Sequence, residues 1–257
     1  MVQALRAVKG MKFIVLLLAF GLIGTRCDAS PVTIGGIAPH HMVAEKRIVN
    51  FYEQISAIAP KPKRVILLGP DHFNAGKTPI TLCGSDWETP SGILRSDAAL
   101  RDFLLESHTV ARQDDIFRRE HSITVHIPFI RQYLKDAVIL PMIIQSRATD
   151  IQILTLRKQL LSFLQEGGVL LLSMDFSHYK TSDEADAEDV KSLASIKNFT
   201  VKRGLDIDCP RGTALFLGIM KDLGTTHISI LGHTNSGKIL GDRNASCTSY
   251  FTLAFFQ

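Results

Sequence analysis

A chain of 257 residues, 46% of them apolar, is long enough to bury a sizeable core as one large domain or two small ones. Its formal net charge is +4, and +3 of this lies in residues 1–29, where four basic residues stand against Asp28 alone. The remaining residues therefore carry about +1 (4 − 3), which excludes the basic surface typical of a nucleic-acid-binding protein.

Residues 1–29 have the pattern of a targeting segment. Lys9 and Lys12 precede an apolar stretch over residues 13–23, which is too short for a comfortable membrane span. Translation from Met11 gives an ordinary signal-peptide layout with a small-x-small cleavage site at its end. We therefore expect an exported protein, periplasmic or secreted. The alternatives are an uncleaved N-terminal membrane anchor and, if the segment does not act as a signal, a cytoplasmic protein.

The rest of the chain alternates apolar runs with amphipathic stretches. The apolar runs predict strands at residues 32–38, 64–68, 80–83, 137–144, 168–174, 228–231 and 250–255. Helical spacing predicts helices at residues 42–58, 98–107, 151–164, 184–196 and 212–223. A turn-rich segment at residues 87–92 is expected to fold as a loop over a site.

Continuous apolar strands separated by amphipathic helices indicate a largely parallel sheet covered on both faces. No linker divides residues 30–257. We therefore expect a single three-layer α/β/α domain there, around a largely parallel central sheet.

Three of the predicted strands are followed by polar residues of the types that bind metal ions. These endings are Pro39-His40-His41, Pro70-Asp71-His72 and Asp175-Phe176-Ser177-His178. Ligands collect at the carboxyl ends of parallel strands in an open α/β sheet, so these side chains are expected at one edge. Imidazole and carboxylate suit iron, copper, zinc and nickel. The sequence therefore predicts a transition-metal pocket at this edge.

Asp175 follows a very apolar strand and is expected to have a partner, because a buried carboxylate is costly when left unpaired. His178, three residues further on, is a candidate general acid or base in the same pocket. The alternative is that Asp175 caps the following segment and that His178 is exposed.

His121 and His126 are five residues apart, which puts them about 140° apart on a regular helix. At most one of them can therefore face a given metal ion from such a helix. Pro128 also disfavours a helix that continues unbroken through this segment. We expect one of the two histidines to assist in the pocket or relay protons, and the other to be structural. Glu120 is placed to hydrogen-bond either.

Five spaced motifs resemble those of the Memo-like proteins, also called AmmeMemoRadiSam system protein B. They are Ile37-Ala38-Pro39-His40, Leu68-Gly69-Pro70-Asp71-His72, Glu120-His121-Ser122-Ile123-x-x-His126-Ile127-Pro128, Ser173-x-Asp175-Phe176-Ser177-His178-Tyr179 and Cys209. The resemblance covers nearly all of the chain after about residue 33. It implies the fold of class III extradiol dioxygenases, which hold non-haem iron(II) with two histidines and a carboxylate.

The resemblance implies that His40 and His72 are the metal-binding histidines. It also implies pocket residues with catalytic roles beside the metal, namely Asp175, His178, His121 and His126. The third ligand is a point of departure. Some Memo-like proteins have a cysteine in the C-terminal segment, whereas residues 234–238 here contain no thiol. Asp175, Asp71 or Glu120 would then have to supply a carboxylate, and His41, which replaces a small residue, is either a further ligand or a surface imidazole.

Beyond residues 1–29, the cysteines are Cys83, Cys209 and Cys247. They are far apart and include no C-x-x-C pair. This spacing indicates neither a zinc ribbon nor a disulfide framework. In an exported protein one pair of them can oxidise.

The function expected from the resemblance is that of a metal-binding protein acting as a non-haem metal-dependent oxidoreductase of the extradiol type. The expected cofactor is iron or copper, with zinc as a further option because export makes iron(II) harder to keep. The expected partners are the metal and a small molecule, with a membrane involved only through residues 1–29. One alternative is a catalytically vestigial metal-binding or redox-accessory protein, and a weaker one is a metal-dependent hydrolase.

Overall fold

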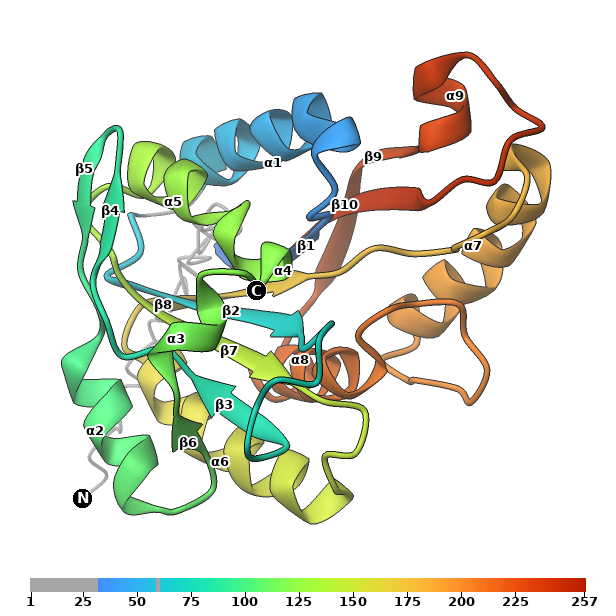
Figure 1. The fold of residues 1–257 in the computed structure, drawn as a ribbon. Coiled ribbons are helices and arrows are strands. Elements are labelled where there is room, and N and C mark those ends of the chain that lie inside the picture. The colour runs from blue at the N-terminus through green and yellow to red at the C-terminus, as the bar shows by residue number, and fades with distance from the viewer. Residues whose placement is uncertain (1–31, 59–60) are drawn as a thin grey trace, which may run out of the picture. The chain divides into compact units, whose positions relative to one another are not determined.

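The computed structural model describes residues 32–58 and 61–257, and the segment expected to be a signal lies outside them (Figure 1). Within these two ranges, no helix has both the length and the apolar character needed to cross a membrane. Apolar runs rich in β-branched residues have formed strands, as expected. The strands are β1 (Thr33–Ala38), β2 (Arg64–Pro70), β3 (Ile80–Leu82), β4 (Trp87–Thr89), β5 (Gly92–Leu94), β6 (Ala111–Arg112), β7 (Val138–Ile144), β8 (Gly168–Ser173), β9 (His227–Asn235) and β10 (Ser249–Phe256).

Eight of the described strands form one sheet in the order β6-β3-β7-β2-β8-β1-β10-β9. The central strands β7, β2, β8 and β1 are mutually parallel. At one flank, β10 runs antiparallel to β1 and to β9. At the other, β3 runs antiparallel to β7 and parallel to β6. The parallel strands are buried along nearly their whole length, which explains their continuous apolar sequences.

Helices cover both faces of the sheet (Figure 1). They are η1 (Met42–Ala44), a 3-10 turn, and α1 (Glu45–Ile58), α2 (Ala98–Glu106), α3 (Asp114–Phe117), α4 (His121–Thr124), α5 (Ile127–Tyr133), α6 (Asp150–Gln165), α7 (Ser182–Lys197), α8 (Pro210–Asp222) and α9 (Ser236–Leu240). Side chains of α1, α4 and α5 pack in one core cluster, and those of α2, α6 and α8 pack in the other. The prediction of an α/β/α architecture around a largely parallel sheet is confirmed.

Two glycines in β1 let a helix approach the strand from each side. A Cβ at Gly36 would lie 2.6 Å from the ring of Phe51 on α1, and one at Gly35 would lie 2.7 Å from the sulfur of Met220 on α8. Both distances are far below a normal contact, so larger residues would displace the helices. The close packing fixes β1 between the two layers and thereby fixes the loop that follows it.

The carboxyl ends of the central strands meet at one edge of the sheet. Ala38 pairs with Ser173, and Leu68 pairs with Leu172 one residue earlier. The segments after β1, β2 and β8 therefore leave the sheet side by side. Residues 87–92 were expected to form a loop over a site. They instead form the β4–β5 hairpin, whose strands contact α5.

Candidate metal centre

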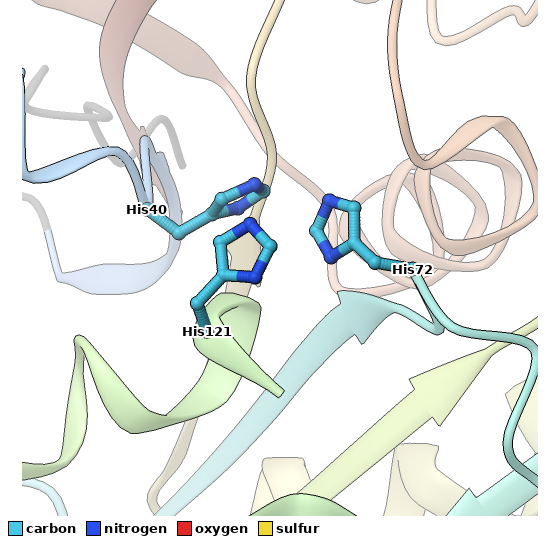
Figure 2. Close-up of side chains that lie close together, drawn as sticks. All are labelled: His40, His72 and His121. Carbon is cyan, nitrogen blue, oxygen red and sulfur yellow. The ribbon is translucent and has the colours of Figure 1, made fainter. Parts of the chain in front are cut away.

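Three imidazoles converge at this edge of the sheet (Figure 2). His40 follows β1, His72 follows β2, and His121 is the first residue of α4. The ring centroid of His40 lies 4.9 Å from that of His72 and 5.1 Å from that of His121. The rings of His72 and His121 stack with centroids 4.2 Å apart. One nitrogen from each ring lies within 4.8 Å of the others, which is compatible with a shared metal ion.

His40 is held from the sheet side. Its side chain is buried, and its Nδ1 lies 2.9 Å from Oγ of Ser173, the last residue of β8. Its backbone N–H donates to Oδ1 of Asp175 at 3.2 Å. These contacts fix the ring orientation and leave Nε2 facing the centre of the cluster.

His72 is held by a buried carboxylate. Its Nδ1 donates to Oε1 of Glu120 at 2.7 Å, and its backbone N–H donates to Oε2 of the same group at 2.9 Å. Glu120 also caps α4, because its side chain accepts from the backbone N–H of Ser122. One side chain therefore orients His72 and sets the start of the helix that carries His121.

A carboxylate that the sequence analysis did not single out completes the cluster. Oδ2 of Asp208 lies 3.1 Å from Nε2 of His40 and 3.8 Å from Nε2 of His72. Asp208 stands immediately before Cys209, with Pro210 at the first position of α8. A proline at that position is a helix-start signal, and a carboxylate is favourable at a helix N-terminus. The Asp-Cys-Pro sequence was therefore an available signal for an acidic residue at the start of a helix, although it does not indicate that this helix starts at the site.

The charges of the cluster are strongly coupled. Burial alone lowers the pKa of His40, but the carboxylates of Asp175 and Asp208 outweigh it and raise that pKa above its ordinary value. Burial likewise opposes the charge of His72, yet Asp208 and Glu120 raise its pKa to about 9. Burial raises the pKa of Asp208, but His40 and His72 outweigh it and lower that pKa to about 2. Without a metal, the carboxylates of Asp208, Asp175 and Glu120 thus favour the protonated forms of His40 and His72.

The donor set fits a transition-metal ion. The Nδ1 atoms of His40 and His72 are occupied by Ser173 and Glu120, so each ring presents Nε2 to the carboxylate of Asp208. Metal-binding histidines are ordinarily oriented by such a hydrogen bond from the other ring nitrogen. An ion would replace the protons that these imidazoles share with the carboxylate.

A cavity of about 660 Å³ opens beside the cluster and is lined by His72, His178 and Asp208 among others. The backbone N–H of His178 donates to Oδ2 of Asp206, which also pairs with Nζ of Lys180 at 2.6 Å. His178 is therefore part of the wall of the cavity next to the metal-binding groups. Asp175 lies deeper, with Oδ2 3.7 Å from Nε2 of His40 and its pKa raised by burial.

His126 lies apart from the three converging imidazoles. It is completely buried, its Nδ1 is 2.9 Å from the hydroxyl of Tyr52, and its Nε2 meets no partner among the described residues. Burial, with a smaller effect from His40, lowers its pKa to about 3. The helix breaks between α4 and α5, and of the two histidines only His121 enters the cluster.

Two further candidate ligands, His41 and Asp71, form hydrogen bonds outside the cluster. Nδ1 of His41 lies 2.7 Å from the hydroxyl of Tyr250, so this imidazole contacts β10. The carboxylate of Asp71 accepts from the backbone N–H groups of Ala75 and Gly76, and from Nε2 of Gln145 at 2.6 Å. Asp71 thus holds the loop after β2 in shape.

None of the three thiols in the described part of the chain belongs to the cluster. Cys83, Cys209 and Cys247 are buried and free. The segment at residues 234–238 packs against α7, because the side chain of Asn235 forms hydrogen bonds with Ser182 and Asp186. Asp208, the neighbour of Cys209, instead brings its carboxylate to 3.1 Å from Nε2 of His40.

Comparison with known proteins shows which family the chain belongs to. The family model described as Memo-like protein matches residues 28–254. The chain belongs to the Memo-like family. Among the relatives of this Memo-like protein, a MEMO1 family protein of Methanosarcina barkeri is 31% identical over 227 residues, covering 82% of this chain and 83% of the relative. One from Pyrobaculum aerophilum is 28% identical over 239 residues, covering 87% and 84%.

The fold of this Memo-like protein also occurs in a solved structure. The crystal structure of the uncharacterized protein JW3007 from Escherichia coli K12 superposes with a TM-score of 0.55 at 13% identity. The match covers 85% of this chain and 99% of that one. It shows that the two proteins share their architecture.

Proposed function

We propose that this Memo-like protein binds one transition-metal ion through His40, His72 and Asp208 and acts as a non-haem metal-dependent oxidoreductase of the extradiol type. The proposal rests on the approach of one carboxylate to the Nε2 atoms of two oriented imidazoles. Two histidines and one carboxylate, with further positions open, are the donor set of non-haem iron(II) oxygenases. When bound, the ion would bring an ortho-dihydroxy aromatic and dioxygen together.

The ligands in this proposal are positioned before any ion arrives. Glu120 and Ser173 hold the rings of His72 and His40, and the backbone of His40 is tied to Asp175. Little reorganisation is then required beyond the loss of protons from the imidazoles. The adjoining cavity of about 660 Å³ is large enough for a small aromatic molecule.

Two imidazoles beside the proposed ligands are available to move protons. His121 is partly exposed, and burial together with the charges of His72 and His40 lowers its pKa. It is therefore neutral at pH 7 and can accept a proton from a substrate hydroxyl. His178, in the wall of the cavity, is the second candidate for this role.

The metal is proposed to be iron, with copper and zinc as the alternatives that the same donors accept. The carboxylate of Asp208, a hard oxygen donor, stands where a thiolate would favour copper(I) or zinc. Metal content is therefore the first quantity to measure, in protein purified from its natural compartment.

The deciding experiment is anaerobic reconstitution with iron(II), followed by exposure to a panel of catechols and air. The proposal predicts one iron per chain and the absorbance of ring-cleaved products, both lost in His40→Ala and His72→Ala. His227→Ala is the matched control, because His227 is exposed at the start of β9. Tight metal binding without turnover across the panel would instead identify a metal-binding protein with a vestigial site. Absence of bound metal would rule out both.

We further propose that residues 1–29 direct export of the protein. The proposal rests on the two lysines that precede an apolar stretch in this segment. Cell fractionation with N-terminal sequencing tests it. A mature protein in the cytoplasm that still begins at Met1 would overturn it.

A further inference from the structure

A second cavity lies on the other side of the segment that carries Asp208. It has a volume of about 710 Å³ and is bounded by α6, α8 and residues 199–205. Its lining includes five cationic side chains: Arg157, Lys202, Arg203, Arg211 and Lys221. Only two acidic side chains, Asp150 and Asp222, accompany them, so the lining carries a net charge of +3 (5 − 2). The whole chain carries only +4, most of it in residues 1–29, so positive charge is concentrated in this cavity.

Much of this positive charge has no partner within the described part of the chain. Arg157 is neutralised, because two of its nitrogens bind the carboxylate of Asp222 at 2.6 and 2.5 Å. Among the described residues no ion pair is formed by Lys202, Arg203 or Lys221. The charged groups of Lys202, Arg203 and Lys221 are therefore available to solvent or to a ligand.

Arg211 adds directional donors to the wall. Its NH2 group pairs at 2.8 Å with Asp150, whose side chain is 95% exposed, so this ion pair is screened by water. Its Nε–H is buried and meets no acceptor within the described ranges. Arg211 is also in the first turn of α8, whose N-terminal residue Pro210 lines the same cavity. The positive end of the helix dipole thus reinforces the charge of the side chains.

The cavity has the size and the mixed walls of a small-molecule site. Phe199, Val201 and Leu217 supply apolar surface in the same lining. A concave site of this volume accommodates a ligand larger than a single inorganic ion. Its shape favours a free small molecule over a flat membrane surface.

We infer that this cavity binds a small-molecule anion carrying phosphate groups. Arginine guanidinium groups and helix N-termini are the usual partners of phosphate oxygens, and lysines add point charges. Gly204, with φ of +83°, turns the chain so that Lys202 and Arg203 line this cavity while Asp206 lines the other. The two sites share this segment but no charged residue, so the inference does not depend on the proposed metal function.

The test is calorimetric titration of the full-length, EDTA-treated protein with inorganic pyrophosphate. We expect one saturable site whose affinity falls at least tenfold in the double variant Lys202→Gln/Arg203→Gln. Both side chains are exposed, so the fold should tolerate the change. The matched control is Lys46→Gln/Lys135→Gln, which removes the same charge from exposed positions on and after the helices α1 and α5 of the opposite face. The control and His40→Ala/His72→Ala should keep the wild-type affinity within twofold.

Several outcomes would overturn the inference. They are no binding of pyrophosphate, equal losses in the two charge variants, and a loss confined to the histidine variant, which would place the anion at the metal centre. A membrane source of phosphate is tested by sedimentation with vesicles of phosphatidic acid and of phosphatidylcholine. Association with the former in the absence of pyrophosphate binding would also overturn the assignment to a free small molecule.

Discussion

The carboxylate of Asp208 lies 3.1 Å from Nε2 of His40, in a position to bind a metal ion together with it. If Asp208 is the third ligand, Asp208→Asn should reduce metal affinity by more than the roughly 10- to 100-fold that loss of an outer hydrogen-bond partner costs. Titration calorimetry with zinc or cobalt measures this directly. Asp206→Asn is the control, because Asp206 lines the same cavity but is paired with Lys180. Equal affinities for the two variants would remove Asp208 from the proposed site.

Glu120 should act on the metal only through His72. Glu120→Gln keeps an acceptor for the N–H of Ser122 but removes the charge that faces Nδ1 of His72. We expect a loss of metal affinity of roughly 10- to 100-fold. In the metal-free protein, NMR titration should show the pKa of His72 falling from about 9 towards its ordinary value. Glu188→Gln, in the wall of the cavity, should change neither quantity.

His126 should make stability depend on pH. Burial holds its pKa at about 3 in the folded protein, against 6.5 ordinarily, so the unfolded chain binds this proton more readily. Its contribution to stability is therefore complete above pH 6.5 and decreases as the pH falls towards 3. At pH 5.0, which is 1.5 units below 6.5, the loss should be about 2 kcal/mol.

Urea unfolding at pH 7.5 and 5.0 tests this expectation. His126→Gln retains a polar partner for Tyr52 but does not titrate, so its loss of stability between the two pH values should be smaller by about 2 kcal/mol. The other titratable groups, histidines and carboxylates alike, are present in both proteins, so their effects cancel in the comparison. Identical pH dependence of wild type and variant would show that His126 does not carry the effect.

Metal binding should stabilise the fold. A ligand at 100 times its dissociation constant adds about 2.7 kcal/mol when it binds only the folded state. For a protein of this length that corresponds to a rise in Tm of roughly 5–10 °C. Differential scanning fluorimetry with and without metal measures the rise, and EDTA should reverse it. A rise of equal size in His40→Ala/His72→Ala would mean that the metal binds elsewhere.

The sequence predicted the parts of the site that follow regular structure. His40 and His72 are each the second residue after an apolar strand of the parallel part of the sheet, so their placement at one edge follows from that sheet. Asp208 was missed because it follows an irregular segment with no apolar run, and its position depends on how residues 199–208 cross the sheet edge. No local pattern encodes such a crossing.

The histidine pair shows a different limit. Pro128 led us to expect an interrupted helix with only one of His121 and His126 assisting in the pocket, and the chain does break between α4 and α5. The five-residue spacing alone does not tell which of the two histidines lies in the pocket. Which of the two joins the cluster is decided by Glu120, whose carboxylate ties the start of α4 to His72. That contact joins segments far apart in the sequence and can be recognised only once the fold is known.

The order of the metal-binding groups along the chain has a consequence for biosynthesis. His40 and His72 are made early, whereas Asp208 follows four further strands of the sheet, β3, β6, β7 and β8, and stands just before α8. Contacts between such distant segments form late, because the intervening chain must first be ordered. A nascent chain that has not yet extended past Asp208 presents imidazoles without their carboxylate. Loading of the proposed metal therefore belongs to the finished protein and follows synthesis instead of guiding it.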